Sequence, residues 1–370
     1  MILRSRVSAW LAISVAVGMA SLPLDASLAD PAPGAPAPGV IERPVSFTVT
    51  NSNSSGIPCP GDESTYEVRG VLVGPTSAFE SGRPQTVSVY LHGFSFGGKF
   101  LWSFKPVPGY DLPVEFAQRG HVSLSIDRLG YDSSGHPHGH LNCIGSSADV
   151  THQIVQALRR GSYEVEGGAP IPVEAVVLVG HDTGGAVAEV EAYSYDDIDG
   201  LVVWGWADQG FSQWVLDRYP ERSAFCARGG EEAESGDPGG GYFHWPSSEE
   251  EVRQDVGQRM EPRVLETSVS MRNRNPCGDL LSAASMSNYH ENGGRLGEID
   301  VPVLLIYSDD DIIFTREGGE QQKAHFTGTD DLTWVMLEDA GHFPMLERRA
   351  EDHRQVLLDW LNDHSFGRRE

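Results

Sequence analysis

The chain has 370 residues, of which 39% are hydrophobic, 22% charged and 9% aromatic, a composition that supports a folded protein with a sizeable core. The formal net charge is −26, from 53 acidic and 27 basic residues. A surface this acidic repels polyanions, so neither nucleic acid nor an anionic membrane is expected as a partner.

The first 29 residues have the pattern of a secretory signal peptide. Two arginines, Arg4 and Arg6, precede the apolar run VSAWLAISVAVGMASL, and the stretch SLA at 27–29 offers small residues for cleavage. A membrane anchor fits less well, because it needs about 20 apolar residues. Residues 30–41 are rich in Pro, Ala and Gly and are typical of a linker. We therefore expect an exported, extracellular protein whose fold begins at residue 42.

Strands and helices are predicted to alternate along most of the chain. The segment 44–75 has the β-branched alternation of an antiparallel start. The expected elements after it are strands at 85–93, 121–127, 174–180, 199–207, 301–308 and 331–339, with helices at 148–163, 185–195 and 351–363. Continuous apolar strands separated by helices predict an α/β fold. Its sheet is expected to be mostly parallel, to have eight strands and to carry helices on both faces.

A long segment interrupts this alternation. Roughly ninety residues of helical and loop character lie between the strands at 199–207 and 301–308, too many for a simple connection. We interpret 211–294 as a helical lid inserted into a core formed by 42–210 and 295–370.

Four cysteines are expected to form disulfides in an exported chain, and four allow three pairings. We favour Cys59–Cys143 and Cys226–Cys277, because the second pair would then close the lid insertion on itself.

The stretch VVLVGHDTGG at 176–185 predicts a strand, a sharp turn and the start of a helix. At its centre Asp182 lies between Gly180 and Gly184 in the pattern G-x-D-x-G. Small residues at these two positions permit the tight strand-to-helix turn of a nucleophile elbow, in which the central side chain projects over the edge of the sheet. An Asp that caps the helix is the structural alternative.

Five motifs in order give the chain a wider resemblance. They are LHGFSFGG (91–98), IDRLGYDSSGHP (126–137), LVGHDTGG (178–185), YSDDDIIF (307–314) and DAGHFPMLE (339–347). Together they resemble the α/β-hydrolase superfamily over nearly all of 44–365, and most of all its exported actinobacterial and fungal members. Those relatives mostly carry Ser at the elbow. In this respect the chain departs from them and resembles epoxide hydrolases and haloalkane dehalogenases, which have Asp there.

The resemblance implies roles for three residues. Asp182 would be the nucleophile, His342 the general base, and Asp311 the acid that orients the histidine. The alternatives for the acid are Asp309, Asp310 and, after the preceding strand, Asp208.

The resemblance also implies an oxyanion hole and a proton donor. The backbone N–H groups of Phe94 and Thr183 would form the hole. As in epoxide hydrolases, a lid tyrosine would protonate the opening oxygen, and the candidates are Tyr219 and Tyr242, with Tyr289 as a third. Each of these tyrosines has packing as its structural alternative.

A carboxylate at the elbow changes the expected chemistry. An aspartate is an anion at neutral pH, because the ordinary pKa of its carboxyl is about 3.9, and it needs no base before it attacks. Attack on an ester would form an anhydride and expel a poorer leaving group. Attack on sp³ carbon instead gives a stable alkyl ester that His342-activated water can hydrolyse.

The sequence therefore predicts a hydrolase that opens epoxides or cleaves carbon–halogen bonds, with epoxides favoured. Dehalogenases usually have Trp where this chain has Thr183, and Asn or Trp where it has Phe94. The chain also departs from epoxide hydrolases, which usually have Pro where it has Ser95. Two alternatives stay open: a lyase, cyclase or isomerase with His342 as base, and a degenerate homologue that only binds a ligand.

The expected partner is a small-molecule substrate under the lid. No cofactor and no metal are expected. The alternating His136, His138 and His140 are interpreted as a solvated loop cluster.

Overall fold

The structure is a computed structural model that describes residues 38–232, 239–291 and 294–367. The expected signal peptide and most of the expected linker lie outside these residues. Within them, no helix is long and apolar enough to cross a bilayer. The first strand begins at Val40, two residues before the predicted start of the fold.

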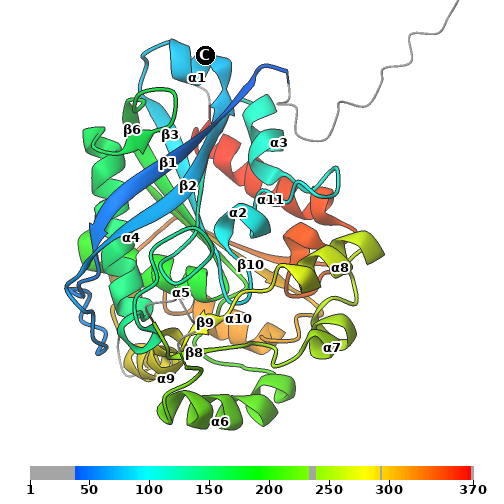
Figure 1. The fold of residues 1–370 in the computed structure, drawn as a ribbon. Helices are drawn as coiled ribbons and strands as arrows, with labels where there is room; N and C mark the ends of the chain where they lie inside the picture. Colours follow the sequence, from blue (N-terminus) through cyan, green and yellow to red (C-terminus); the bar gives the residue numbers. More distant parts are fainter. Residues whose placement is uncertain (1–37, 233–238, 292–293, 368–370) are drawn as a thin grey trace, which may run out of the picture. The chain divides into compact units, whose positions relative to one another are not determined.

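A large sheet runs through the described chain (Figure 1), with the strand order β11-β10-β7-β6-β3-β4-β2-β1-β5. The bounds are β1 Val40–Thr50, β2 Thr65–Pro75, β3 Gln85–Leu91, β4 Val122–Ile126, β5 Glu164–Val165, β6 Val173–His181, β7 Gly200–Trp204, β10 Val303–Ser308 and β11 Leu332–Leu337. In this order, every neighbouring pair from β11 through to β4 is parallel. The remaining pairs, β4–β2, β2–β1 and β1–β5, are antiparallel and lie at one edge. The sheet has nine strands rather than the eight predicted, because the two-residue β5 pairs with Val45 and Ser46 of β1.

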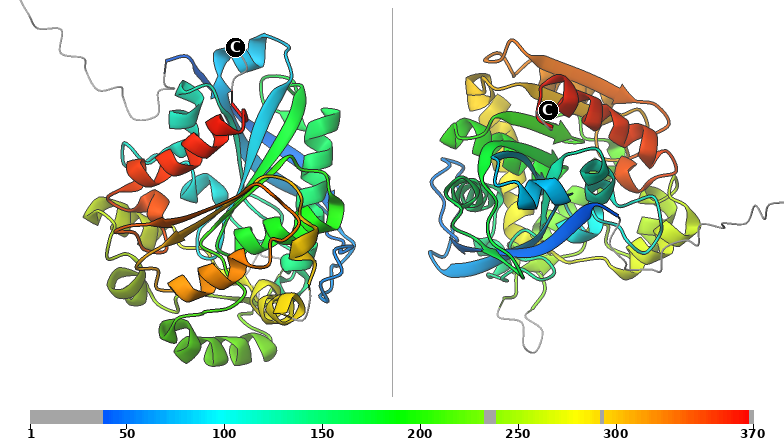
Figure 2. Two further views of the ribbon diagram at one scale, coloured as in Figure 1. Left: turned by 180° about the vertical axis from the view of Figure 1, so that it is seen from behind. Right: turned by 90° about the horizontal axis from the view of Figure 1, so that it is seen from above.

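Helices cover both faces of the sheet, as the apolar strands predict (Figure 2). The core helices are α1 Thr76–Glu80, α2 Gly98–Leu101, α3 Leu112–Gln118, α4 Ile144–Arg160, α5 Thr183–Tyr195, α10 Arg316–Lys323 and α11 Ala350–Asp363. Alternate residues of β6 belong to different hydrophobic clusters of the core. Val176 and Leu178 belong to the cluster that includes α4 and α5, and Val177 and Val179 to the one that includes α3 and α11. Burying both faces of the strands in this way removes the apolar side chains from water.

Helix α4 begins four residues earlier than the predicted 148. Its N-cap is Cys143, and Ser146 forms the reciprocal hydrogen bond of a capping box with it. These two residues satisfy N–H groups at the helix start, which explains the earlier boundary.

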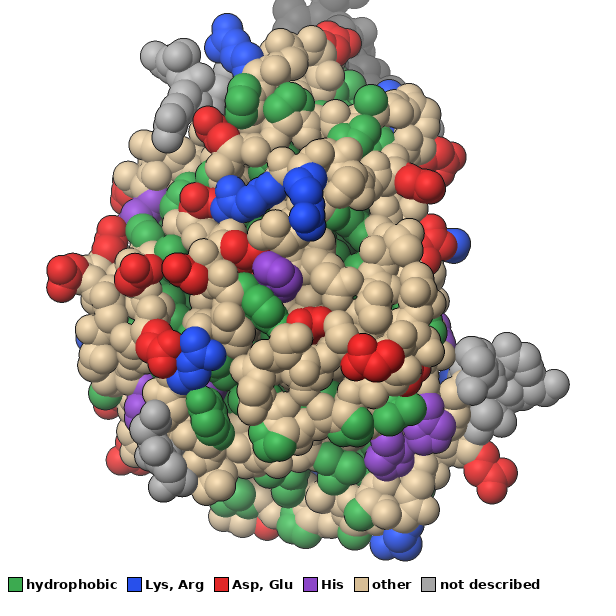
Figure 3. Space-filling view, turned by 90° about the vertical axis from the view of Figure 1, so that its left-hand side faces the viewer, with side chains coloured by type: hydrophobic (Ala, Val, Ile, Leu, Met, Phe, Trp, Pro, Cys, Tyr) green, Lys and Arg blue, Asp and Glu red, His purple; other side chains and the backbone are tan. Residues whose placement is uncertain are grey.

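The segment predicted as the lid forms further helices between β7 and β10. They are α6 Gln213–Ala227, α7 Glu249–Glu251, α8 Pro262–Ser270 and α9 Cys277–Glu291, with a small antiparallel pair of β8 Tyr242–Phe243 and β9 Asn275–Pro276. In Figure 1 these elements lie below the sheet and beside its lower end. Acidic side chains are spread over the face shown in Figure 3, with only a few Lys or Arg among them.

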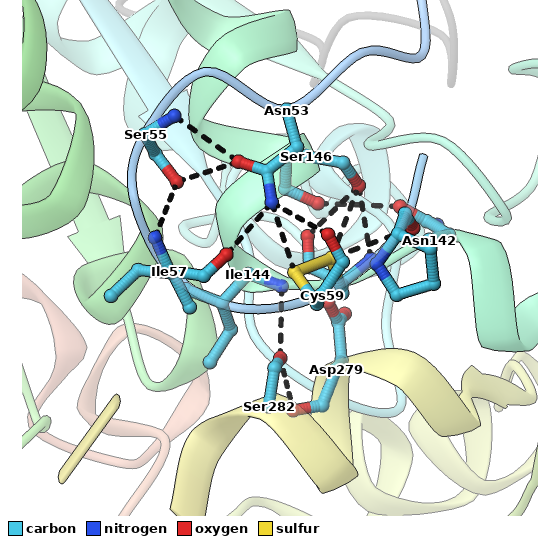
Figure 4. Close-up of a disulfide and its surroundings, with 12 residues drawn as sticks. Asn53, Ser55, Ile57, Cys59, Asn142, Ile144, Ser146, Asp279 and Ser282 are labelled. Atoms are coloured by element: carbon cyan, nitrogen blue, oxygen red, sulfur yellow. Dashed lines mark hydrogen bonds between the residues drawn. A yellow bond between two sulfur atoms is a disulfide. The ribbon is translucent and has the colours of Figure 1, made fainter. Parts of the chain in front are cut away.

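Both predicted disulfides are confirmed. Cys226 at the end of α6 is bonded to Cys277 at the start of α9, so this disulfide closes within the insertion. Cys59 is bonded to Cys143, and Figure 4 shows its surroundings. There the hydroxyl of Ser282, from α9, accepts the backbone N–H of Ile144 at 3.1 Å, which joins the insertion to α4 of the core.

Candidate active site

Asp182 lies at the turn between β6 and α5 in a backbone conformation that side chains other than glycine rarely adopt. Its φ is +50° and its ψ is −127°. Such strain costs about 1–3 kcal/mol and persists only where the surroundings fix it. Here the Asp182 N–H donates to the carbonyl of Trp204 on β7 at 3.0 Å. A Cβ on Gly180 would lie 2.2 Å from the carbonyl oxygen of Gly184, so a larger residue does not fit there.

The two carboxylate oxygens of Asp182 have different surroundings. Oδ2 accepts the backbone N–H of Phe94 at 2.9 Å and the hydroxyl of Thr183 at 3.2 Å. Thr183 therefore contacts this oxygen through its side chain, whereas the sequence predicted its backbone N–H. Gly93 leaves room for this carboxylate, because a Cβ at that position would lie 2.4 Å from Oδ2. The other oxygen, Oδ1, lies 3.8 Å from Nε2 of His342.

His342 lies in the loop after β11 and is oriented by Asp311. Its Nδ1 lies 3.0 Å and 3.1 Å from the two carboxylate oxygens of Asp311. Asp311 is itself held in place, because its Oδ1 accepts the N–H groups of Ile313 and Phe314. A hydrogen bond from Nδ1 to a carboxylate fixes the tautomer in which Nε2 is free to accept a proton.

The other three candidates for the acid have different partners. Asp309 accepts the N–H of Ala340, Asp310 pairs with Arg259 at the surface, and Asp208 contacts His290 rather than His342. The structure thus brings Asp182, His342 and Asp311 together.

Burial and charge set the protonation of the two neighbouring histidines. Burial lowers the pKa of His342, but the charge and hydrogen bond of Asp311, with the charge of Asp182, outweigh it and leave that pKa above the ordinary 6.5. Burial and the charge of His342 lower the pKa of His181 to about 4. His181 is therefore neutral at pH 7, and its Nε2–H donates to the carbonyl of His342 at 2.7 Å.

A model of the "Alpha/beta hydrolase family" matches residues 89–353 of the chain. The chain belongs to the α/β hydrolase family. No curated protein matches the sequence. Among solved structures, an esterase from Thermogutta terrifontis superposes with a TM-score of 0.56 at 17% identity, covering 86% of this chain and 98% of its own.

Two further neighbours have the same fold at similar distance. The enol-lactonase from Burkholderia xenovorans has a TM-score of 0.56 at 16% identity and covers 80% of this chain and 97% of its own. An esterase from Exiguobacterium antarcticum has a TM-score of 0.55 at 14% identity, with 85% and 100% covered. At such identities the likeness concerns the fold of this α/β hydrolase and not its substrate.

A cavity of about 610 Å³ opens beside Asp182 in this α/β hydrolase, between the core and the inserted helices. Most of its lining is aromatic or aliphatic, including Trp206, Phe211, Val215, Trp245, Leu280 and Phe314. Among the described residues that line it, the side chains of Asp, Glu, His, Lys or Arg type are those of Asp182 and Asp208, and both are acidic. An apolar cavity with few polar groups is typical of a small-molecule site, and its charges disfavour an anionic ligand.

The predicted lid tyrosines have different places. Tyr219 on α6 lines the cavity. Tyr242 does not: it is buried in β8, and its hydroxyl donates to the carbonyl of Pro137 at 2.7 Å. Tyr289 is partly exposed and also does not line the cavity. Of the histidines in the loop before α4, His140 contacts the carbonyl of Cys226 through Nε2.

Sequence reasoning missed Glu347, although it ends the motif that contains His342. Its carboxylate accepts the N–H groups of Gly341 at 2.8 Å and Phe343 at 3.2 Å, which flank the histidine. Burial raises the pKa of Glu347 to about 7, against the opposing effect of these two hydrogen bonds. An acidic residue five positions after a loop histidine was the available signal, but its role depends on how the short turn Pro344–Leu346 folds back.

Proposed function

We propose that this α/β hydrolase uses Asp182 as a covalent nucleophile at an sp³ carbon, and that its substrate is an apolar epoxide. The observation that carries the proposal is the difference between the two Asp182 oxygens. Oδ2 is held by the N–H of Phe94 and the hydroxyl of Thr183, while Oδ1 belongs to a side chain that lines the cavity and faces His342.

In the first step, Oδ1 attacks an epoxide carbon and forms a new C–O bond. The opposite C–O bond of the ring breaks, and its electron pair stays on the leaving oxygen. Tyr219 supplies the proton for this oxygen, because it lines the same cavity, and burial raises its pKa so that the phenol stays protonated. The product of this step is an alkyl ester of Asp182 with an adjacent hydroxyl group.

In the second step, His342 takes a proton from water through Nε2, and the oxygen of that water attacks Cγ of Asp182. The developing oxyanion is Oδ2, which already has two donors directed at it. Collapse of this intermediate breaks the bond between Cγ and Oδ1, and the imidazolium of His342 gives its proton to the departing oxygen, which releases the diol. Asp182 is left as a carboxylic acid, and its proton returns to the phenolate of Tyr219, so that all three groups regain their starting state. The 3.8 Å between Nε2 and Oδ1 exceeds a hydrogen bond, so the imidazole is not occupied by the nucleophile.

Two features favour an epoxide over a haloalkane. The residues next to the nucleophile and in the oxyanion turn are Thr183 and Phe94, neither of which has an indole or amide N–H side chain for a leaving halide. Tyr219, in contrast, offers an O–H group within the cavity. Export is part of the proposal too, and the two disulfides are compatible with an oxidising, extracellular compartment.

A single turnover in ¹⁸O-labelled water tests the mechanism. The enzyme is mixed in excess with members of a panel of apolar epoxides and primary haloalkanes, and the peptide that contains Asp182 is analysed by mass spectrometry. We expect one ¹⁸O atom in Asp182 and none in the first product. Product without label in Asp182 would instead indicate that His342 acts as base in a lyase, cyclase or isomerase. No product from any member would favour a ligand-binding homologue.

A further inference from the structure

A second group of ionisable side chains contains none of the three residues Asp182, His342 and Asp311 and has no part in the proposed reaction. It consists of Glu189 on α5, Asp208 after β7 and His290 on α9. These side chains are 0%, 3% and 2% exposed, and one ligand atom from each lies within 4.8 Å of the other two. Two core elements and one inserted helix thus direct two carboxylates and an imidazole to one point.

Each of the three side chains is held from outside by a second polar group. Gln322 donates to Oε1 of Glu189 at 2.8 Å. The indole N–H of Trp206 donates to Oδ1 of Asp208 at 3.3 Å. The hydroxyl of Tyr193 lies 3.2 Å from Nε2 of His290.

One further ligand atom of each side chain is not engaged by these outer groups. Oδ2 of Asp208 and Nδ1 of His290 are 2.7 Å apart, and Oε2 of Glu189 is buried without a hydrogen-bond partner among the described residues. In metal sites too, the ligands gather at one point, and each is also held by a hydrogen bond to a group outside the site.

The charge of the group also points to a cation. Within the part of the chain that the structure describes, neither Glu189 nor Asp208 forms an ion pair with Lys or Arg, and His290 is the one basic partner of Asp208. Two buried carboxylates without compensating charge are costly, and a divalent ion would make the pair neutral.

We propose that Glu189, Asp208 and His290 bind a divalent transition-metal ion, Zn²⁺ above all. Carboxylate oxygen and imidazole nitrogen are both ligands of Zn²⁺, and three protein ligands leave a fourth position. Asp208 lines the substrate cavity, so this cavity gives the ion a way in. The bound ion would fasten α9, and with it the inserted segment, to α5 and the end of β7. No spacing motif in the sequence indicates this site, since its ligands come from three distant segments.

The chain offers a matched control in the same helix. Glu191 is also on α5, is also fully buried, and lies near His152 and Asp197 in a group of the same composition. That group is more open, because the side chains of His152 and Asp197 are partly exposed, at 28% and 12%.

The experiment uses tag-free protein, stripped with a chelator and then titrated with Zn²⁺ by calorimetry, with Mn²⁺ and Ca²⁺ as parallel arms. Metal content after dialysis is measured by plasma mass spectrometry, and the Co²⁺ form is examined by visible absorption. We expect one Zn²⁺ per chain and a raised Tm with metal. Both should be lost in Glu189→Gln and kept in Glu191→Gln. Replacement of an outer partner, in Gln322→Ala, should weaken binding by about 10–100-fold.

Several outcomes would overturn the proposal. One is stripped wild-type protein that binds neither Zn²⁺ nor Mn²⁺, which would mean that Glu189 is simply protonated. Others are binding that is lost in Glu191→Gln but kept in Glu189→Gln, or binding of Ca²⁺ alone. If Glu189→Gln does not fold, Gln322→Ala decides, because an unchanged Zn²⁺ affinity in that variant would contradict the site.

Discussion

Two buried histidine–aspartate pairs lie close to the same cavity, and they differ in what the second ring nitrogen faces. Nδ1 of His342 contacts Asp311 at 3.0 Å, and Nδ1 of His290 contacts Asp208 at 2.7 Å. Nε2 of His342 faces the Asp182 carboxylate at 3.8 Å, whereas Nε2 of His290 contacts the hydroxyl of Tyr193. A carboxylate beside a buried imidazole therefore does not by itself make a general base.

The two aspartates of these pairs, Asp311 and Asp208, also differ in their surroundings. Asp311 accepts two backbone N–H groups of its own loop, so the pair with His342 is complete without further ligands. Asp208 instead lies next to a second carboxylate, that of Glu189, with which it has an unfavourable charge interaction. In the two proposals made above, the first pair moves a proton and the second holds a cation. Substitutions on each side can test this division.

The largest effect is expected for Asp182→Asn. An amide is not a nucleophile. Turnover of the substrate with which wild-type Asp182 acquires ¹⁸O from water should therefore fall to the background rate. The change is nearly isosteric and should leave the fold intact, which circular dichroism can check. Slow recovery of activity would mean hydrolysis of the amide back to Asp182, and mass spectrometry would detect it. Full activity without such recovery would contradict the covalent mechanism.

His342→Gln should separate the two steps. Asp182 can still attack, but the water has no base, so turnover should fall about 10²–10⁴-fold and the alkyl ester should accumulate. Intact-protein mass spectrometry should show one substrate mass added per chain. The corresponding change in the other pair, His290→Gln, should not accumulate this adduct. An adduct in both variants would mean that both histidines act on the ester.

Asp311→Asn is expected to have the next effect, about 10²-fold on turnover, which is the lower end of general acid–base contributions, because the amide no longer favours the tautomer with a free Nε2. It should also change the pH dependence. The Asp311 charge raises the pKa of His342, and only the neutral imidazole accepts a proton, so wild-type turnover should fall as the pH drops through that raised pKa. In Asp311→Asn the pKa of His342 is expected to be lower, so the fall in turnover on the acid side should move to lower pH.

A matched control for that variant is Asp310→Asn, one residue earlier. Asp310 is exposed and pairs with Arg259. The pH profile of turnover in Asp310→Asn should therefore match that of the wild type. Equal shifts in both variants would show that the profile reports overall charge and not the pair.

Much of this arrangement was predictable from the sequence because it depends on local patterns. Asp182 and His342 each lie in a motif fixed by a strand end and a short turn, and parallel strands bring their carboxyl ends to one edge of the sheet. The choice of Asp311 among its neighbours came from the resemblance to α/β hydrolases. The disulfide pairing followed from assigning two cysteines to one insertion.

The parts that could not be predicted depend on how the inserted segment folds. Tyr219 and Tyr242 are equivalent candidates in the sequence, yet the β8–β9 pair buries Tyr242 while α6 brings Tyr219 to the cavity. The pairing of Asp208 with His290 joins residues 82 positions apart through α9, whose direction no local pattern specifies.

Thr183→Val should have a smaller effect, about 10-fold on turnover, because it removes one donor to a charged oxygen and leaves the N–H of Phe94 in place. The reduction should appear in the hydrolysis of the ester, since the oxyanion forms at Oδ2 in that step. Rapid-quench measurement of ester formation and decay would separate the two rates. A loss confined to ester formation would contradict the assignment of Oδ2.

The smallest effect on turnover is expected for Glu347→Gln, which tests how each histidine is anchored. His290 is held by helix α9, whereas His342 is in a loop whose N–H groups are held by Glu347. The pKa of Glu347 is about 7 in the folded chain and 4.5 ordinarily, so the folded state binds a proton more tightly than the unfolded state. Wild-type stability should therefore decrease as the pH rises from about 4.5 to 7, by at most roughly 3 kcal/mol. Gln cannot titrate, so urea unfolding of Glu347→Gln should lack this decrease, and the variant should gain stability relative to wild type as the pH rises. Parallel curves for the two proteins across this range would mean that Glu347 is ionised in the fold, and the His342 loop would then be anchored by a charge.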